Sequence, residues 1–125
     1  MRRRWRQALA VLLAICFLIM PCHAQSWWPD TATVKKLEAG NFPKLGQSPD
    51  LSRYARYYTG LNENGHHVIA GELISWVDDS RPAGVHIVAS EKEFPVIFDG
   101  GCSVIHIHYD VDTSQITRLT CNGRA

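Results

Sequence analysis

The sequence predicts an α+β domain with an antiparallel four- to five-stranded meander sheet, a short N-terminal helix and one disulfide. Three observations favour this fold class. β-prone runs recur about every ten residues with turn signals between them. A short helical pattern precedes these runs. Cys102 and Cys121 flank a strand–turn–strand pattern near the C-terminal end of the sequence.

The first 24 residues have the three parts of a secretory signal peptide. Four arginines precede the thirteen apolar residues at 8–20, and Cys22 and Ala24 put small residues at a cleavage site. We expect cleavage after Ala24, which leaves a single exported domain at 25–125. A spanning helix needs about 20 apolar residues, so we expect no stable membrane insertion after cleavage.

Cleavage changes both the charge and the cysteine count. The chain of 125 residues has 13 basic and 12 acidic residues, a net charge of +1, and four cysteines. Removal of residues 1–24 takes away four arginines and two cysteines, which leaves 101 residues near −3. This balance argues against a nucleic-acid partner, since such partners are bound by excess basic charge. A periplasmic or secreted location permits oxidation, so we expect a Cys102–Cys121 disulfide.

The residues between these cysteines alternate as a half-buried hairpin does. Ile105, Ile107 and Tyr109 share one face of the first predicted strand, and the opposite face carries Val104, His106, His108 and Asp110. A polar turn at 110–115 leads to a second strand at 116–121. We expect the first face to be core and the second to be a solvated polar face.

The remaining elements follow from turn and cap signals. Thr31–Ala39 reads as a helix with Asp30 as N-cap and Gly40 after its end. Residues 51–59 fit either a helix or the first strand of a hairpin, and we favour the hairpin. Strands are expected at 68–77, where Gly71 indicates a bulge or a close backbone approach, and at 85–89.

The candidate metal ligands are histidines. His106 and His108 project from one face of a strand, and His86 lies on another predicted strand that would bring it near if the two strands pair. Two histidines with a third form a zinc-compatible set. Zinc is the one cofactor the sequence raises. We expect no catalytic serine or cysteine, because none lies in an activating motif.

Aromatic side chains offer a second kind of site. Trp27 and Trp28 follow the signal segment, have polar neighbours and would contact a protein or sugar partner if exposed. In a domain this short, most other aromatic rings are expected to form the core.

Several short segments together resemble a type of small exported proteobacterial protein that has no assigned activity. They are Tyr54-Ala-Arg-Tyr-Tyr58, Val68-Ile-Ala-Gly71, Asp99-Gly-Gly-Cys102-Ser-Val-Ile105, Tyr109-Asp110 and Cys121-Asn-Gly123. The resemblance implies an exported single domain and carries over no catalytic residue.

The function expected from the sequence is that of a non-enzymatic binding or inhibitor-like module acting on an envelope or extracellular protein partner. The alternative is a zinc-binding protein or small hydrolase that uses His86, His106 and His108. An unpaired edge strand or an exposed aromatic patch would favour binding, and a pocket that encloses the three histidines would favour the alternative.

Overall fold

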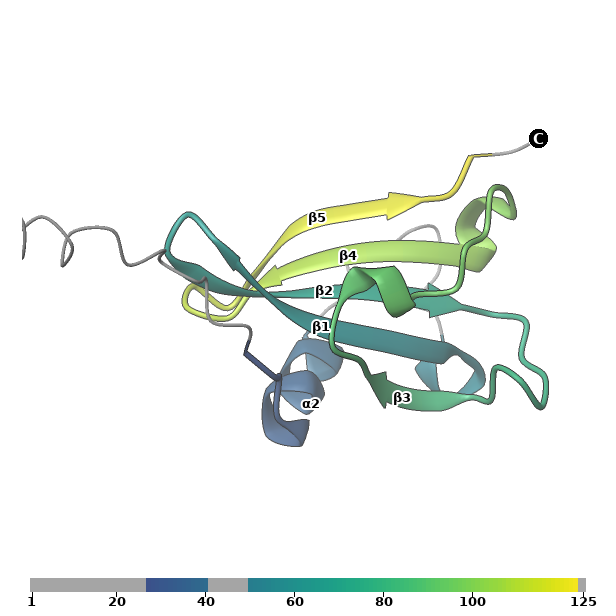
Figure 1. Cartoon of the computed structure of the whole chain (residues 1–125), viewed down its shortest axis with the longest axis horizontal. Coiled ribbons are helices and arrows are strands. Elements are labelled where there is room, and N and C mark those ends of the chain that lie inside the picture. Colours follow the sequence, from purple (N-terminus) through teal and green to yellow (C-terminus); the bar gives the residue numbers. More distant parts are fainter. Residues whose placement is uncertain (1–26, 41–49, 124–125) are drawn as a thin grey trace, which may run out of the picture.

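The computed structural model describes residues 27–40 and 50–123, in which a five-stranded sheet carries one α-helix. The arrangement is shown in Figure 1. The elements in chain order are α2 (Thr31–Ala39), η1 (Leu51–Arg53), β1 (Ala55–Glu63), β2 (His66–Ile74), β3 (Gly84–Ile87), η2 (Glu91–Glu93), η3 (Gly101–Ser103), β4 (Val104–Asp110) and β5 (Gln115–Cys121). The predicted signal segment at 1–24 lies outside the described residues.

Helix α2 has the predicted bounds. The Thr33 N–H donates to Asp30 Oδ1 (2.7 Å), which satisfies a backbone donor that the helix itself leaves unpaired. At the other end the Gly40 N–H donates to the Leu37 carbonyl (3.2 Å). Val34 and Leu37, the predicted apolar positions, are the two buried residues of α2. The helix prediction is confirmed.

The strand order is β3-β1-β2-β4-β5, which differs from a meander. The pairs β1–β2, β2–β4 and β4–β5 are antiparallel, whereas β3 pairs with β1 in parallel. The prediction of a purely antiparallel meander is therefore wrong, although the sheet-rich α+β class is confirmed. Both edges of β2 are occupied by β1 and β4, so β3 joins the remaining edge of β1.

Residues 51–59, whose sequence fits either a helix or a strand, contain parts of two elements. The first of these residues form the single turn η1, and the chain then enters β1 at Ala55. Asn64 and Gly65 join β1 to β2 with positive φ angles of 51° and 79°, as the favoured two-residue hairpin turn requires. The hairpin interpretation is confirmed from Ala55 onward.

Gly71 marks a close approach and not a bulge. The register of β2 with both of its neighbours continues unbroken through this residue. A Cβ atom at Gly71 would lie 2.7 Å from the Tyr58 ring and 2.8 Å from Cγ2 of Ile107. The glycine therefore makes room for the Tyr58 ring to lie across the sheet.

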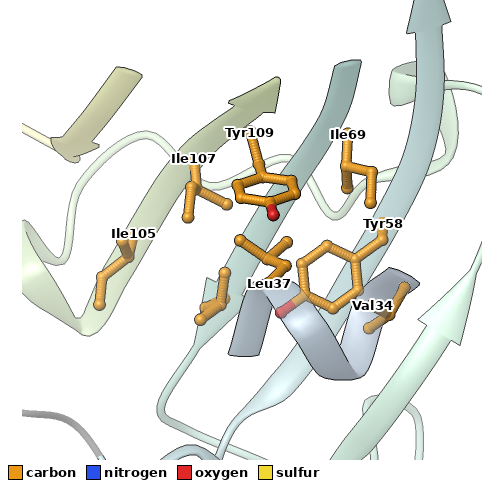
Figure 2. Close-up of a cluster of buried hydrophobic side chains, with 8 residues drawn as sticks. Val34, Leu37, Tyr58, Ile69, Ile105, Ile107 and Tyr109 are labelled. Atoms are coloured by element: carbon orange, nitrogen blue, oxygen red, sulfur yellow. The ribbon is translucent and has the colours of Figure 1, made fainter. Parts of the chain in front are cut away.

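The main core lies between α2 and the sheet, as Figure 2 shows. Its buried members come from α2, β1, β2 and β4 and are Val34, Leu37, Tyr58, Ile69, Leu73, Ile105, Ile107 and Tyr109. The Tyr58 hydroxyl donates to Glu38 Oε1 (3.0 Å), and that oxygen also pairs with Arg56 Nη1 (2.9 Å). The buried phenol thus has a polar partner supplied by α2.

The predicted disulfide is present. Cys102 and Cys121 are bonded, with Cα atoms 4.6 Å apart, and they join the start of β4 to the end of β5. The hairpin of β4 and β5 and its core face of Ile105, Ile107 and Tyr109 are confirmed.

The chain between β3 and β4 crosses the sheet face that lies away from α2, as the green segment of Figure 1 shows. We call residues 88–103 the crossing segment. Its Val88 N–H donates to the Tyr58 carbonyl (2.9 Å), and its Glu91 Oε1 lies 3.8 Å from His108 Nε2. Val104 and Asp110, expected on a solvated face, are buried on this side of the sheet.

Candidate functional site

A row of polar side chains runs across the sheet on the face that carries the crossing segment. The strand registers align one residue from each strand, from β3 to β5: His86, Tyr57, Glu72, His106 and Thr120. Side chains at paired positions project from the same face. The row therefore places a carboxylate and an imidazole side by side at its centre.

Glu72 is the buried member of this row. Its side chain is 6% exposed, and its Oε2 lies 3.6 Å from His106 Nδ1. Within the described residues, Oε1 is buried without a hydrogen-bond partner. Burial raises the pKa of the Glu72 carboxyl, and the charges of His106 and Arg81 partly oppose this shift. The carboxyl thus binds its proton more tightly than an exposed glutamate does.

His106 joins Glu72 to the C-terminal end of β5. Its Nε2 lies 2.6 Å from Asn122 Oδ1. The Asn122 Nδ2 donates to the carbonyls of Ile97 (2.7 Å) and Asp99 (3.0 Å). Because the amide nitrogen supplies both of these bonds, Asn122 Oδ1 is the acceptor and His106 Nε2 carries the hydrogen. The other ring nitrogen, Nδ1, faces Glu72.

Asn122 thereby fixes a loop with exposed apolar side chains. We call residues 94–100 the anchored loop. Phe98 is 91% exposed and Val96 is 78% exposed, the two highest values among the exposed large hydrophobic residues. At the end of the loop, the Trp76 ring lies against Gly100, where a Cβ would come within 2.6 Å of it. The loop is held on both sides while the Phe98 side chain faces solvent.

His108 and His86 have different partners from His106. His108 Nδ1 lies 3.2 Å from Glu63 Oε1. His86 Nε2 lies 2.8 Å from the Pro82 carbonyl oxygen, and its ring stacks on Tyr57 with centroids 4.9 Å apart.

The strand order keeps His86 apart from the other two predicted zinc ligands, His106 and His108. His106 and His108 share a face of β4, as the alternation predicts. β3 pairs with β1 and not with the hairpin of β4 and β5. Two strands, β1 and β2, therefore lie between His86 on β3 and the two histidines on β4. With strands about 4.8 Å apart, the separation is roughly 14 Å. The sheet does not bring the three imidazoles together.

A different group of possible metal ligands lies at the turn between β4 and β5. Ligand atoms of His66, Asp110 and Asp112 lie within 4.8 Å of one another. His66 Nδ1 is 2.6 Å from Asp110 Oδ2, and Asp112 Oδ2 accepts from the His67 N–H (3.1 Å). These contacts link the two hairpin turns. The sequence reasoning missed them because β2 and β4 are not consecutive strands.

Trp27 and Trp28 have different environments. The Trp27 Nε1–H donates to the Leu61 carbonyl (2.8 Å), and its ring stacks on His67 with centroids 4.8 Å apart. Trp28 is 58% exposed. Of the two predicted partner-binding aromatics, Trp27 is therefore packed on the sheet and Trp28 faces solvent.

Two features that would favour binding lie at the surface of the described residues. β5 is an edge strand of the sheet, with β4 on one side, and the anchored loop exposes Phe98 and Val96. Sequence reasoning did not select Asn122 or Phe98. The one available signal was the run Phe94-Pro-Val-Ile-Phe98, which is apolar without the alternation of a half-buried strand.

Comparisons with protein-family models, curated proteins and solved structures give no match to this chain. In residues 27–40 and 50–123, no helix has the length and apolar character needed to span a membrane.

Proposed function

We propose that this protein is an exported, non-enzymatic binding module that contacts a protein partner through the anchored loop. The observation that carries the proposal is the 91% exposure of Phe98 on a loop whose backbone is hydrogen-bonded to Asn122. A periplasmic or secreted location agrees with the Cys102–Cys121 disulfide.

Both the Phe98 side chain and the backbone of the anchored loop favour binding. Burying a phenylalanine against a partner contributes about 1.5–3 kcal/mol, so Phe98 is suited to be an interface anchor. A loop that is already fixed loses less conformational entropy on binding than a flexible one does. Two further exposed apolar residues belong to or contact this loop: Val96, 78% exposed, and Trp76, 39% exposed, whose ring lies against Gly100.

The test is capture of a partner from an extract of the source cell envelope, with three forms of the purified protein as bait. We expect wild type and Trp28→Ala to retain one stoichiometric partner and Phe98→Ala to lose it. Trp28 is the matched control because it is also an exposed aromatic residue, 58% exposed, outside the anchored loop.

Neither substitution removes a buried side chain, so all three baits are expected to fold equally well by circular dichroism. A partner that binds Phe98→Ala as tightly as wild type would contradict the proposal. Loss of the partner with Trp28→Ala alone would move the interface to the other end of the described chain.

A further inference from the structure

The peptide bond between Phe98 and Asp99 lies between two anchored carbonyls. Asn122 Nδ2 bonds to the carbonyl of Ile97, which precedes Phe98, and to that of Asp99, which follows it. The Phe98 carbonyl lies between them and accepts no hydrogen bond within the described residues. One side-chain amide thus supports the backbone on both sides of a single exposed residue.

Exposure of the side chains alternates over three residues of this segment. Val96 and Phe98 are 78% and 91% exposed, whereas Ile97 between them is half-buried. The chain enters the segment in an extended conformation at Phe94, with φ −66° and ψ 144°. The chain then bends at Phe98, the most exposed residue of the segment, so this side chain is free to enter a pocket of a partner.

The support behind the loop is rigid. The Asn122 N–H donates to the Val104 carbonyl (3.1 Å), and the preceding Cys121 is bonded to Cys102. Asn122 Oδ1 is held by His106, whose other nitrogen faces the buried Glu72. His106 and Glu72 are positioning residues here, because they orient the amide that contacts the loop.

We propose that the anchored loop is a substrate-like inhibitory segment for a serine endopeptidase with an apolar specificity pocket, which Phe98 would enter. This inference rests on the proposed function, since it names the class of partner. Specificity pockets of such enzymes accept one large side chain of the segment they bind. A fixed, exposed phenylalanine beside a peptide bond that is held in place meets that requirement.

The same geometry explains why the segment would inhibit and not simply be digested. Hydrolysis of the Phe98–Asp99 bond consumes one water and leaves a carboxylate on Phe98 and an amine on Asp99. Asn122 holds the residues on both sides of the break, so the new ends stay together and can condense again with release of that water. The cut protein therefore remains bound and is released slowly.

The first test uses the purified exported protein with its disulfide, and chymotrypsin and trypsin as probes that accept aromatic and basic residues, respectively. Wild type is expected to inhibit chymotrypsin and not trypsin. Phe98→Arg is expected to lose about 100-fold in affinity for chymotrypsin and to gain inhibition of trypsin. Phe98 is 91% exposed, so this exchange leaves folding unchanged.

The second test concerns the anchor. Asn122→Ala is expected to be cleaved after Phe98 about tenfold faster than wild type, because two backbone hydrogen bonds are lost. Mass spectrometry of the reaction identifies the bond that is cut. If Asn122→Ala does not fold, the exchange of specificity by Phe98→Arg decides the matter.

Two outcomes would overturn the inference: wild type that leaves chymotrypsin uninhibited, or Phe98→Arg that keeps the specificity of wild type. Such a result would leave the proposed function standing if Phe98→Ala still loses its captured partner, and the partner would then not be a peptidase of this class. Failure of both experiments would remove the anchored loop as an interface.

Discussion

Replacement of Gly71 by alanine probes the close packing at the centre of the sheet. The added methyl would lie 2.7 Å from Cδ1 and Cε1 of Tyr58 and 2.8 Å from Cγ2 of Ile107. Carbon atoms pack best about 3.5–4.0 Å apart, so the neighbours would have to move by roughly 0.8 Å. Tyr58 and Ile107 are both 0% exposed, and neither can move into solvent.

The expected cost combines two opposing effects. Overpacking a core by one methyl destabilises by about 1–3 kcal/mol. Alanine in a strand is better than glycine by roughly 0.5–1 kcal/mol, because it loses less backbone entropy on folding. Since the Tyr58 hydroxyl is also bonded to Glu38, we expect a net loss in the upper half of this balance, about 1–2 kcal/mol.

Urea unfolding followed by circular dichroism measures this loss. Gly123→Ala is the matched control, because a Cβ there meets nothing within 4 Å, and its stability should change by less than about 0.5 kcal/mol. In a Tyr58→Leu background, Gly71→Ala should cost less than in wild type, since the clashing ring is gone. An unchanged stability of Gly71→Ala, or an equal cost in both backgrounds, would refute the explanation.

Three further predictions concern the disulfide, the Glu72 carboxyl and the pair of His66 and Asp110. Cys102→Ser combined with Cys121→Ser should lower the free energy of unfolding by roughly 3 kcal/mol, since the bond closes a separation of 19 positions; equal urea midpoints for both forms would contradict this. The raised pKa of Glu72 means that the fold binds this proton more tightly than the unfolded chain, so its contribution to stability falls as pH rises above 4.5. Glu72→Gln should therefore gain stability relative to wild type from pH 4 to pH 8 in thermal melts, and a constant difference would rule out this titration. The Asp110 hydrogen bond and charge raise the pKa of His66, and His66 lowers the pKa of Asp110, so the advantage of wild type over His66→Gln should be greatest between pH 3.8 and 6.5. It should decline as pH rises through the raised pKa of His66 or falls through the lowered pKa of Asp110; a maximum above pH 8 in urea titrations would be inconsistent with the pair.

Local patterns predicted the parts of this fold that depend on neighbouring residues in the chain. The cap at Asp30, the turn at Asn64-Gly65 and the alternation around Ile107 each act within a few positions, and each is confirmed. Cys102 and Cys121 were paired by the chemistry of the expected compartment. These signals need no knowledge of the tertiary structure.

The position of β3 could not be predicted in the same way. Its turn and its β-branched residues indicate a strand, but its place beside β1 depends on β2 being paired on both edges. That single difference moves His86 away from His106 and removes the predicted convergence of three imidazoles. The zinc interpretation relied on a pairing between strands that the sequence does not encode locally.

The candidate site was only partly visible for the same reason. His106 was singled out for its spacing from His108, and it does share that face of β4. Its partner Asn122 lies after β5, and the carbonyls of Ile97 and Asp99 belong to the crossing segment. A backbone acceptor has no residue type, so no motif could have indicated these contacts.

The strand order also has a consequence for how the chain folds. Four of the five strands form two local hairpins, β1–β2 and β4–β5, which meet along β2 and β4, where Val68 pairs with Asp110. Hairpins of nearby strands form in about 1–10 μs, whereas contacts between distant segments are slowed by the entropy of closing a long loop. Cys102 lies in η3, directly before β4, and Cys121 ends β5, so the disulfide joins the two ends of the second hairpin. Oxidation of this pair therefore does not have to wait for the two hairpins to dock, and a thiol-trapping time course should show the disulfide forming even when β2 carries a substitution that prevents docking.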